Sequence, residues 1–145
     1  MTTMLTASRW LYTTLAADAT IHGIVADRIY VDQDTTQTAP ASAYPLIELT
    51  QMSNMVVRGV GTDNIMWDEI WLVKGISTKS APTELEPLLN QVRTALHAAA
   101  GSTVTSGSVS GTMIACTEER VIQYSEVDNG IPYYHLGIEF RIYTQ

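Results

Sequence analysis

The sequence has few of the residues that most catalytic or nucleic-acid-binding sites require. It contains one cysteine, Cys116, so no intramolecular disulfide can form, which suits a reducing compartment. A lone cysteine in an expected strand is usually a small buried apolar residue. Eight scattered lysine and arginine residues stand against 15 acidic ones, and the formal net charge is −7. Because duplex DNA is bound through a cationic patch, this distribution predicts no specific binding of nucleic acid.

The sequence also lacks long apolar runs. None approaches the length of a membrane span, and the first residues lack the basic and apolar segments of a signal peptide. We therefore expect no membrane association. With 145 residues, of which 46% are hydrophobic, the chain is long enough for one domain with its own core, over residues 1–145.

Motifs that carry chemistry are missing as well. There is no Gly-x-Ser-x-Gly elbow and no phosphate-binding Gly-Lys-Ser/Thr sequence. His22, His97 and His135 have no second ligand at metal-binding spacing. Asp32 and Asp34 form an acidic pair, but no glycine and glutamate follow at the calcium-loop positions. We therefore predict no catalytic residue, no metal and no cofactor, and a protein that is not an enzyme.

The clearest feature that is present is an alternating pattern at the end of the chain. On the expected last strand, one face carries Tyr134, Leu136, Ile138, Phe140 and Ile142. Such a period of two is typical of a half-buried antiparallel strand. The Asp-Asn-Gly sequence at residues 128–130 is a strong turn signal because Asn and Gly tolerate positive φ. Residues 118–145 therefore predict a long closing hairpin.

Further strands are expected at residues 28–31, 44–52, 65–77 and 113–116. The strand at 65–77 has apolar residues on both faces, with Trp67, Trp71 and Val73 on one and Met66, Ile70, Leu72 and Ile76 on the other. This pattern indicates a central strand or one that meets a partner. The Gly/Ser/Thr-rich segment 101–111 favours a polar strand and loop over a linker between domains.

Two helices and a short helical turn complete the expected elements. The first helix covers residues 5–17, and Asp18 can cap the short turn that follows. The second helix, expected over residues 82–100, has an apolar stripe formed by Leu85, Leu88, Leu89, Val92 and Leu96. Thr83 or Ser80 would be its N-cap and Gly101 its C′ residue. The order of elements predicts an α+β fold, with a mainly antiparallel sheet and helices packed on one face.

Two polar or glycine-containing segments, 32–43 and 53–64, are candidates for contact with a partner. The predicted contact residues are Asp32, Asp34, Thr36, Arg58 and Asp63. Trp67 and Trp71 are the candidates for a subunit interface. Core packing is the ordinary role of such residues, and an aromatic shelf for a ligand is a further alternative.

Several segments together resemble the tail-terminator or tail-completion proteins of long-tailed bacteriophages. Residues 15–30 are similar to that family's opening, a helix followed by an Asp-Arg-Ile-Tyr strand. Tyr44-Pro-Leu-Ile-Glu-Leu resembles its next strand, Val92-Arg-Thr-Ala-Leu96 its long helix, and the tyrosine-rich hairpin its end.

The resemblance implies a structural virion protein of the tail or neck, assembled in the host cytoplasm. It would form a ring, usually a hexamer, cap the head-proximal end of the tail tube and end tube polymerisation. Its partners would be the tail tube protein and a neck or head-completion protein, and DNA would pass through the ring. The alternatives are a neck or head-completion protein, a tail-tube-like subunit, or a small soluble ligand-binding domain.

Overall fold

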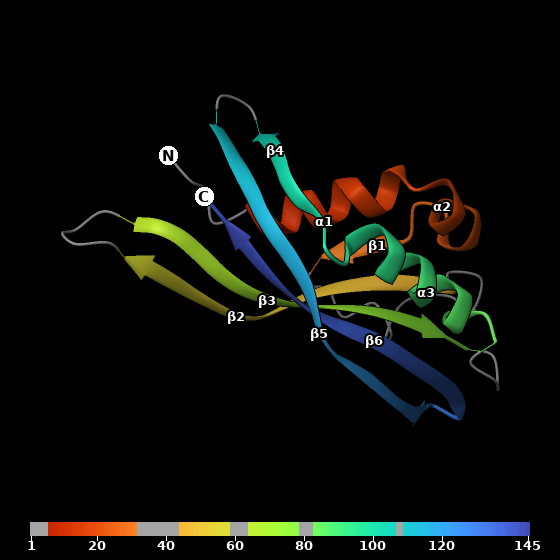
Figure 1. Ribbon diagram of the computed structural model, residues 1–145. Helices are drawn as coiled ribbons and strands as arrows, with labels where there is room; N and C mark the ends of the chain where they lie inside the picture. Colours follow the sequence, from red (N-terminus) through yellow and green to blue (C-terminus); the bar gives the residue numbers. More distant parts are fainter. Residues whose placement is uncertain (1–5, 32–43, 59–63, 79–82, 107–108) are drawn as a thin grey trace.

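Three helices cover one face of a six-stranded sheet in the computed structural model, which describes residues 6–31, 44–58, 64–78, 83–106 and 109–145 (Figure 1). In chain order the elements are α1 (Thr6–Ala17), α2 (Ala19–Val25), β1 (Ile29–Val31), β2 (Leu46–Arg58), β3 (Asn64–Ser77), α3 (Leu85–Leu96), β4 (Ala100–Ser106), β5 (Val109–Asp128) and β6 (Ile131–Thr144). The strand order is β1-β2-β3-β6-β5-β4, and only β1 and β2 run parallel. The predicted α+β class is confirmed.

The two longest apolar patterns form the centre of the sheet. β3 pairs with β6 from Trp67 opposite Thr144 to Ser77 opposite Tyr134. β2 flanks β3 on one side, and β5 flanks β6 on the other. The central position predicted for residues 65–77 is therefore confirmed, and it explains why both faces of β3 are rich in apolar residues.

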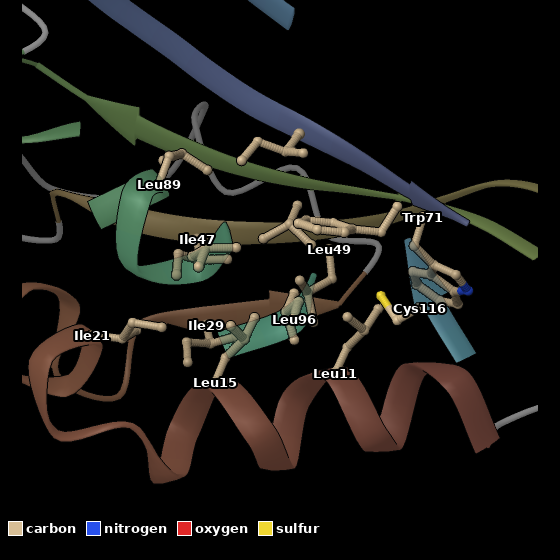
Figure 2. Close-up of a cluster of buried hydrophobic side chains, with 14 of the residues drawn as sticks. Leu11, Leu15, Ile21, Ile29, Ile47, Leu49, Trp71, Leu89, Leu96 and Cys116 are labelled. Carbon is tan, nitrogen blue, oxygen red and sulfur yellow. The ribbon is translucent and has the colours of Figure 1, made fainter. Parts of the chain in front are cut away.

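The core lies between the sheet and the helices (Figure 2). On the sheet side, Trp71 of β3 and Phe140 of β6 are among its members. Leu11 and Leu15 of α1 meet them from the helix side, and the whole predicted stripe of α3 is buried. Alternation in the strands and helical spacing in α1 and α3 thus turn two apolar surfaces toward each other.

Asp18 caps α2, as its position in the sequence predicts. Its Oδ1 accepts hydrogen bonds from the backbone N–H groups of Thr20 and Ile21, at 2.9 and 3.0 Å. Its Oδ2 accepts one from Nε2 of Gln91 in α3, at 2.8 Å. Burial alone would raise the pKa of Asp18, but these three hydrogen bonds outweigh it and the pKa is lowered. The cap therefore also ties α2 to α3.

The ends of α3 differ from the prediction. The helix is shorter than 82–100, and its N-cap is Glu84, which makes no side-chain capping bond, so Thr83 is not the cap. Ser80 lies outside the described residues. At the other end Ala98 has a positive φ of 61°, and Gly101 belongs to β4.

Backbone pairing with β5 explains the early end of α3. The N–H of Ala98 donates to the carbonyl of Cys116 at 2.9 Å, and the N–H of Cys116 donates to the carbonyl of Ala99 at 3.0 Å. These bonds draw the chain into the sheet directly after the helix. β4 then forms the polar strand expected from the Gly/Ser/Thr-rich segment, and the structure places it at an edge of the sheet.

The strands are longer than expected. For segment 53–64 the glycines and Asp63-Asn64 favour a hairpin or a looser excursion, and the hairpin is what forms: β2 continues to Arg58 and pairs with β3. Residues 59–63 lie outside the described part. β5 runs on through residues 113–116 into the closing hairpin. The predicted turn is confirmed, with positive φ at Asn129 and Gly130. No helix in the described ranges combines the length and apolar character of a membrane span.

Candidate assembly surface

Most of the predicted contact residues lie outside the part of the chain that the structure describes. These are Asp32, Asp34, Thr36 and Asp63. Arg58 is described, and it is exposed as the last residue of β2. No described residue forms an ion pair with it. The partner-contact hypothesis for segment 32–43 therefore stays a prediction.

The two tryptophans on β3 occupy different environments. Trp71 is 3% exposed and packs inside the core, so it has no surface to offer to a partner or a ligand. Its Nε1 donates to Oε1 of Glu69 at 3.3 Å. Trp67 is half-buried and pairs with Val56 of β2 on the same face. The interface prediction therefore stays open for Trp67, whereas Trp71 has the ordinary role of a core residue.

Glu69 is a buried acid that sequence reasoning missed. It is 1% exposed, and its carboxylate accepts hydrogen bonds from Gln51 Nε2 at 2.7 Å, Trp71 Nε1 at 3.3 Å and Thr144 Oγ1 at 3.5 Å. Burial raises the pKa of Glu69, and the three donors offset only part of that effect. The cluster joins β2, β3 and β6 at the base of the hairpin formed by β2 and β3.

The β2–β3 hairpin extends well past the helices (Figure 1). Its outer half exposes three apolar side chains of β2, with exposed fractions of 50% for Met52, 58% for Met55 and 37% for Val57. A bulge between Gln51 and Ser53 marks where β2 leaves the covered part of the sheet. Apolar groups gathered on a projecting arm are typical of a protein–protein contact.

The hairpin of β5 and β6 projects at the opposite end of the sheet (Figure 1). It exposes Val121, Tyr124, Val127 and Ile131, with Val127 the most exposed at 72%. A bulge between Glu118 and Arg120 precedes this exposed section. The fold thus has two projecting hairpins, each with its own set of exposed apolar residues.

A network of polar side chains fixes the base of the β5–β6 hairpin on the face away from the helices. Lys74 Nζ lies 3.3 Å from Glu48 Oε1 and donates to the hydroxyl of Tyr124 at 3.1 Å. The Tyr124 ring stacks on His135 with centroids 4.3 Å apart, and His135 Nε2 lies 2.9 Å from Glu126 Oε1. Four strands are therefore joined by contacts between side chains.

Ion pairs hold the rest of that face. Arg141 and Asp68 form a bidentate pair at 2.9 and 2.6 Å, and Arg120 and Glu139 form another at 2.7 and 3.0 Å. The pKa values of both arginines are raised, first because of the hydrogen bonds from these guanidinium groups to the carboxylates. Bidentate geometry fixes both partners in orientation. The charges of these side chains are therefore compensated within the subunit.

Among the described residues, candidate metal ligands stay apart and the one cysteine is buried. No three His, Cys, Asp or Glu side chains among them come together as metal ligands. Burial raises the pKa of Cys116 to about 12, so the thiol stays protonated near neutral pH. Two shallow hollows of about 360 and 420 Å³ lie beside α1. Trp67 and Trp71 are not among the described residues that line either hollow, and Arg9 is the one charged residue among those.

Comparison with known proteins gives a structural match without a sequence match. No protein-family model matches the chain, and no curated protein does. Among solved structures, 24 chains match. One is a chain from the virion of a native gene transfer agent particle, with a TM-score of 0.68 and 15% sequence identity. The match covers 98% of this chain and 98% of that chain, so the two share their fold from end to end.

Proposed function

We propose that this chain is a structural protein of a tailed virion or phage-like particle. The observation that carries the proposal is the end-to-end structural match to a chain from a gene transfer agent virion. The two projecting hairpins with exposed apolar residues support it, because they offer contact surfaces to other subunits. The proposed role is assembly, without catalytic turnover, and the proposed location is the particle.

Within that class, we propose the role of tail terminator. The subunit would form a ring, with a hexamer as the expected size, on the head-proximal end of the tail tube. There it would end tube polymerisation and provide the surface for a neck or head-completion protein. The support is the resemblance of four sequence segments to that family, together with a fold that contains the elements those segments predicted. A net charge of −7 is compatible with a ring that lets DNA pass without holding it.

Deleting the gene from the genome that encodes this chain separates the candidate roles. Loss of a terminator gives tails of uncontrolled length. Loss of a neck or head-completion protein gives tails of normal length that do not join heads, and loss of a tube subunit gives no tails. Electron microscopy of the particles measures all three outcomes. Normal, infective or gene-transferring particles would overturn the whole proposal and favour a soluble ligand-binding domain.

The same particles test the contact residues predicted from sequence. Shortening segment 32–43 should leave the subunit folded but produce overlong tails, or tails that fail to join heads. The mutation Arg58→Glu reverses the charge at the end of β2. It should also produce overlong tails, or tails that fail to join heads. Circular dichroism of the purified variants serves as the folding control. Normal tails from both variants would place the contacts elsewhere on the subunit.

A further inference from the structure

His135 is buried on the face of the sheet that the helices leave uncovered. In the pairing register it lies between Ile76 of β3 and Tyr124 of β5. The Tyr124 ring stacks on the imidazole, with an angle of 8° between the ring planes. Ile76 is fully buried in a small cluster with Leu46 and Tyr133. The imidazole therefore has an aromatic neighbour on one strand and an apolar neighbour on the other.

The two ring nitrogens of His135 have different surroundings. Nε2 lies 2.9 Å from Oε1 of Glu126. An ionised carboxylate only accepts hydrogen bonds, so this contact assigns the proton of the neutral imidazole to Nε2. Nδ1 is then the unprotonated nitrogen, and it is buried without a partner among the described residues. A second proton on Nδ1 would therefore create a buried donor that no described group accepts.

The titratable groups around His135 on this face come from all four strands of the region. They are Glu48 of β2, Lys74 of β3, Tyr124 and Glu126 of β5, and Tyr133 of β6. Lys74 opposes a charged imidazole. Glu126 favours one, but its side chain is 48% exposed, so water screens its charge. Burial and then Lys74 lower the pKa of His135, and the two acids offset only part of that effect.

The outer half of β5, residues 119–128, has little burial of its own. It begins at the bulge after Glu118 and belongs to the projecting hairpin (Figure 1). No residue from Val121 to Val127 is buried. β6, in contrast, contributes Ile138 and Phe140 to the core. Because segments with few buried side chains open at a lower free energy than the core, the outer half of β5 can separate while β6 stays in the sheet.

We propose that His135 is a pH-dependent latch for the outer half of β5. When the imidazole is neutral, its stack on Tyr124 and its hydrogen bond to Glu126 hold this part of β5 against β6. When Nδ1 takes up a proton, the closed site has no acceptor for it. Protonation therefore favours a state in which Tyr124 has moved away and water reaches the ring.

Linkage sets the size of the effect. In the open state His135 binds a proton at its ordinary pKa of 6.5, whereas in the closed state it does so only at lower pH. For one such group, the ratio of open to closed subunits rises by up to about tenfold between about pH 7.5 and 5.5. The latch is thus closed near neutral pH and loosens in mild acid.

The latch is a property of the subunit itself. Its use would be to control an arm that presents Val127 and Ile131 to other subunits, and this use rests on the proposed function. An arm that opens in acid would present these residues in an ordered form only near neutral pH.

Hydrogen exchange of the purified subunit tests the latch. The amides of residues 121–127 that bond to β6 should be less protected than those of Phe140 and Ile142 in the core. After correction for the intrinsic effect of pH on exchange, their protection should fall by up to about tenfold from about pH 7.5 to 5.5. This loss should be largely absent in His135→Gln. His22→Gln is the matched control and should keep it, because His22 is exposed on α2.

Two results of this experiment would overturn the latch. The first is equal protection of residues 121–127 and of the core at both pH values, because β5 would then open only together with the whole subunit. The second is the same loss of protection in His135→Gln as in the unmodified subunit.

An NMR titration of the imidazole gives an independent test that needs no change at His135. The ring nitrogen shifts should show the proton on Nε2 near neutral pH. Lys74→Gln removes the repelling charge, so His135 should titrate at a higher pH than in the unmodified subunit. Arg9→Gln, which removes an exposed charge on α1, is the control and should leave the titration unchanged.

Titration of His135 at or above its ordinary pKa in the unmodified subunit would overturn the inference, as would equal titrations in Lys74→Gln and Arg9→Gln. Both experiments use the isolated subunit. Their failure leaves the proposed function intact, whereas normal particles after deletion of the gene would overturn the proposed function and leave the latch intact.

Discussion

His135 is the buried residue whose protonation the fold opposes most clearly. It is 3% exposed, and its Nδ1 is buried without a hydrogen-bond partner in the described structure. Burial lowers the pKa of His135, and the positive charge of Lys74 lowers it further. Glu126 and Glu48 act in the opposite direction but do not reverse the effect. The imidazole therefore prefers to be neutral in the folded subunit.

This preference predicts that acid destabilises the subunit through His135. In the unfolded chain the histidine takes up a proton as the pH falls through its ordinary pKa of 6.5, whereas in the fold it does so only at lower pH. The unfolded state then binds more protons than the folded state. The free energy of unfolding therefore decreases as the pH decreases. Urea unfolding at pH 7.5 and 5.5 should show a smaller loss for His135→Gln than for the unmodified protein.

The comparison between variants matters because Glu69 acts in the opposite direction. Its raised pKa contributes stability at low pH that is lost as the pH rises. Glu69 is unchanged in His135→Gln, so the difference in slope isolates the histidine. His22→Gln is the matched control, since His22 is exposed on α2. Equal slopes for all three proteins would show that His135 does not set the acid response.

At the scale of elements, the docking of α3 on β3 depends on Gly75. A Cβ at this position would lie 2.9 Å from Leu89 Cδ2 and 3.1 Å from Leu85 Cδ2. Gly75→Val should therefore force the leucines of α3 apart and lower the free energy of unfolding by about 1–3 kcal/mol, as overpacking does. Chemical denaturation measures the change.

Gly23→Ala is the control for that experiment. Gly23 lies inside α2, and a Cβ there meets nothing within 4 Å. Alanine at an open position in a helix should be neutral or stabilise by up to about 1 kcal/mol. If Gly75→Val leaves the free energy of unfolding unchanged, α3 can move away from the sheet without a loss of stability.

The apolar stripe of α3 leads to a sharper prediction. Leu88 is fully buried against the sheet. Leu88→Asp would bury a charge without a partner, so the subunit should fail to fold or should melt at a much lower temperature. Asn90→Asp, two residues away on the exposed side of the helix, should melt normally. An unchanged melting curve for Leu88→Asp would contradict the position of α3.

The sequence predicts the faces of these elements better than their ends. Alternation in β6 and helical spacing in α3 are local properties, and the structure confirms that their apolar faces turn toward the core. The half-buried character expected for β6 is wrong, because His135 and Glu139 on its polar face are buried as well. β2 continues past residue 52 because β3 supplies partners as far as Asn64, which is a nonlocal cause. α3 stops at Leu96 because Cys116, distant in sequence, binds the backbone that follows.

At the scale of the whole molecule, the lengths of the outer strands β1 and β4 could not be predicted from the sequence. They depend on how far each strand finds pairing partners in its neighbour, which is a property of the complete sheet. Core packing, the ordinary role expected for such tryptophans, is confirmed for Trp71. Glu69 could not be predicted in this way, because nothing in the local sequence shows that it is buried beside Gln51. Local patterns thus predicted the fold class and the closing hairpin, whereas the assembled sheet determines how far each strand extends.

The whole-molecule charge leads to the last prediction, which concerns DNA. Among the described residues, Lys74, Arg93, Arg120 and Arg141 are paired with carboxylates within the subunit. The net charge of −7 then repels the phosphate backbone. Few cationic side chains are left to neutralise phosphates and release their counterions. Fluorescence polarisation with a labelled duplex near physiological salt should show no saturation below about 10⁻⁴ M, the weak end of non-specific binding.

The effect of salt makes this test decisive. Binding through phosphates would strengthen steeply as the salt concentration falls, so a titration that stays flat from 200 to about 50 mM salt agrees with a repelling surface. Saturable binding near 1 µM would contradict the prediction and would require a cationic patch formed by residues outside the described ranges or by neighbouring copies. In a ring that only lets DNA pass, weak affinity is an advantage, because each retained phosphate contact would slow the passage of the genome.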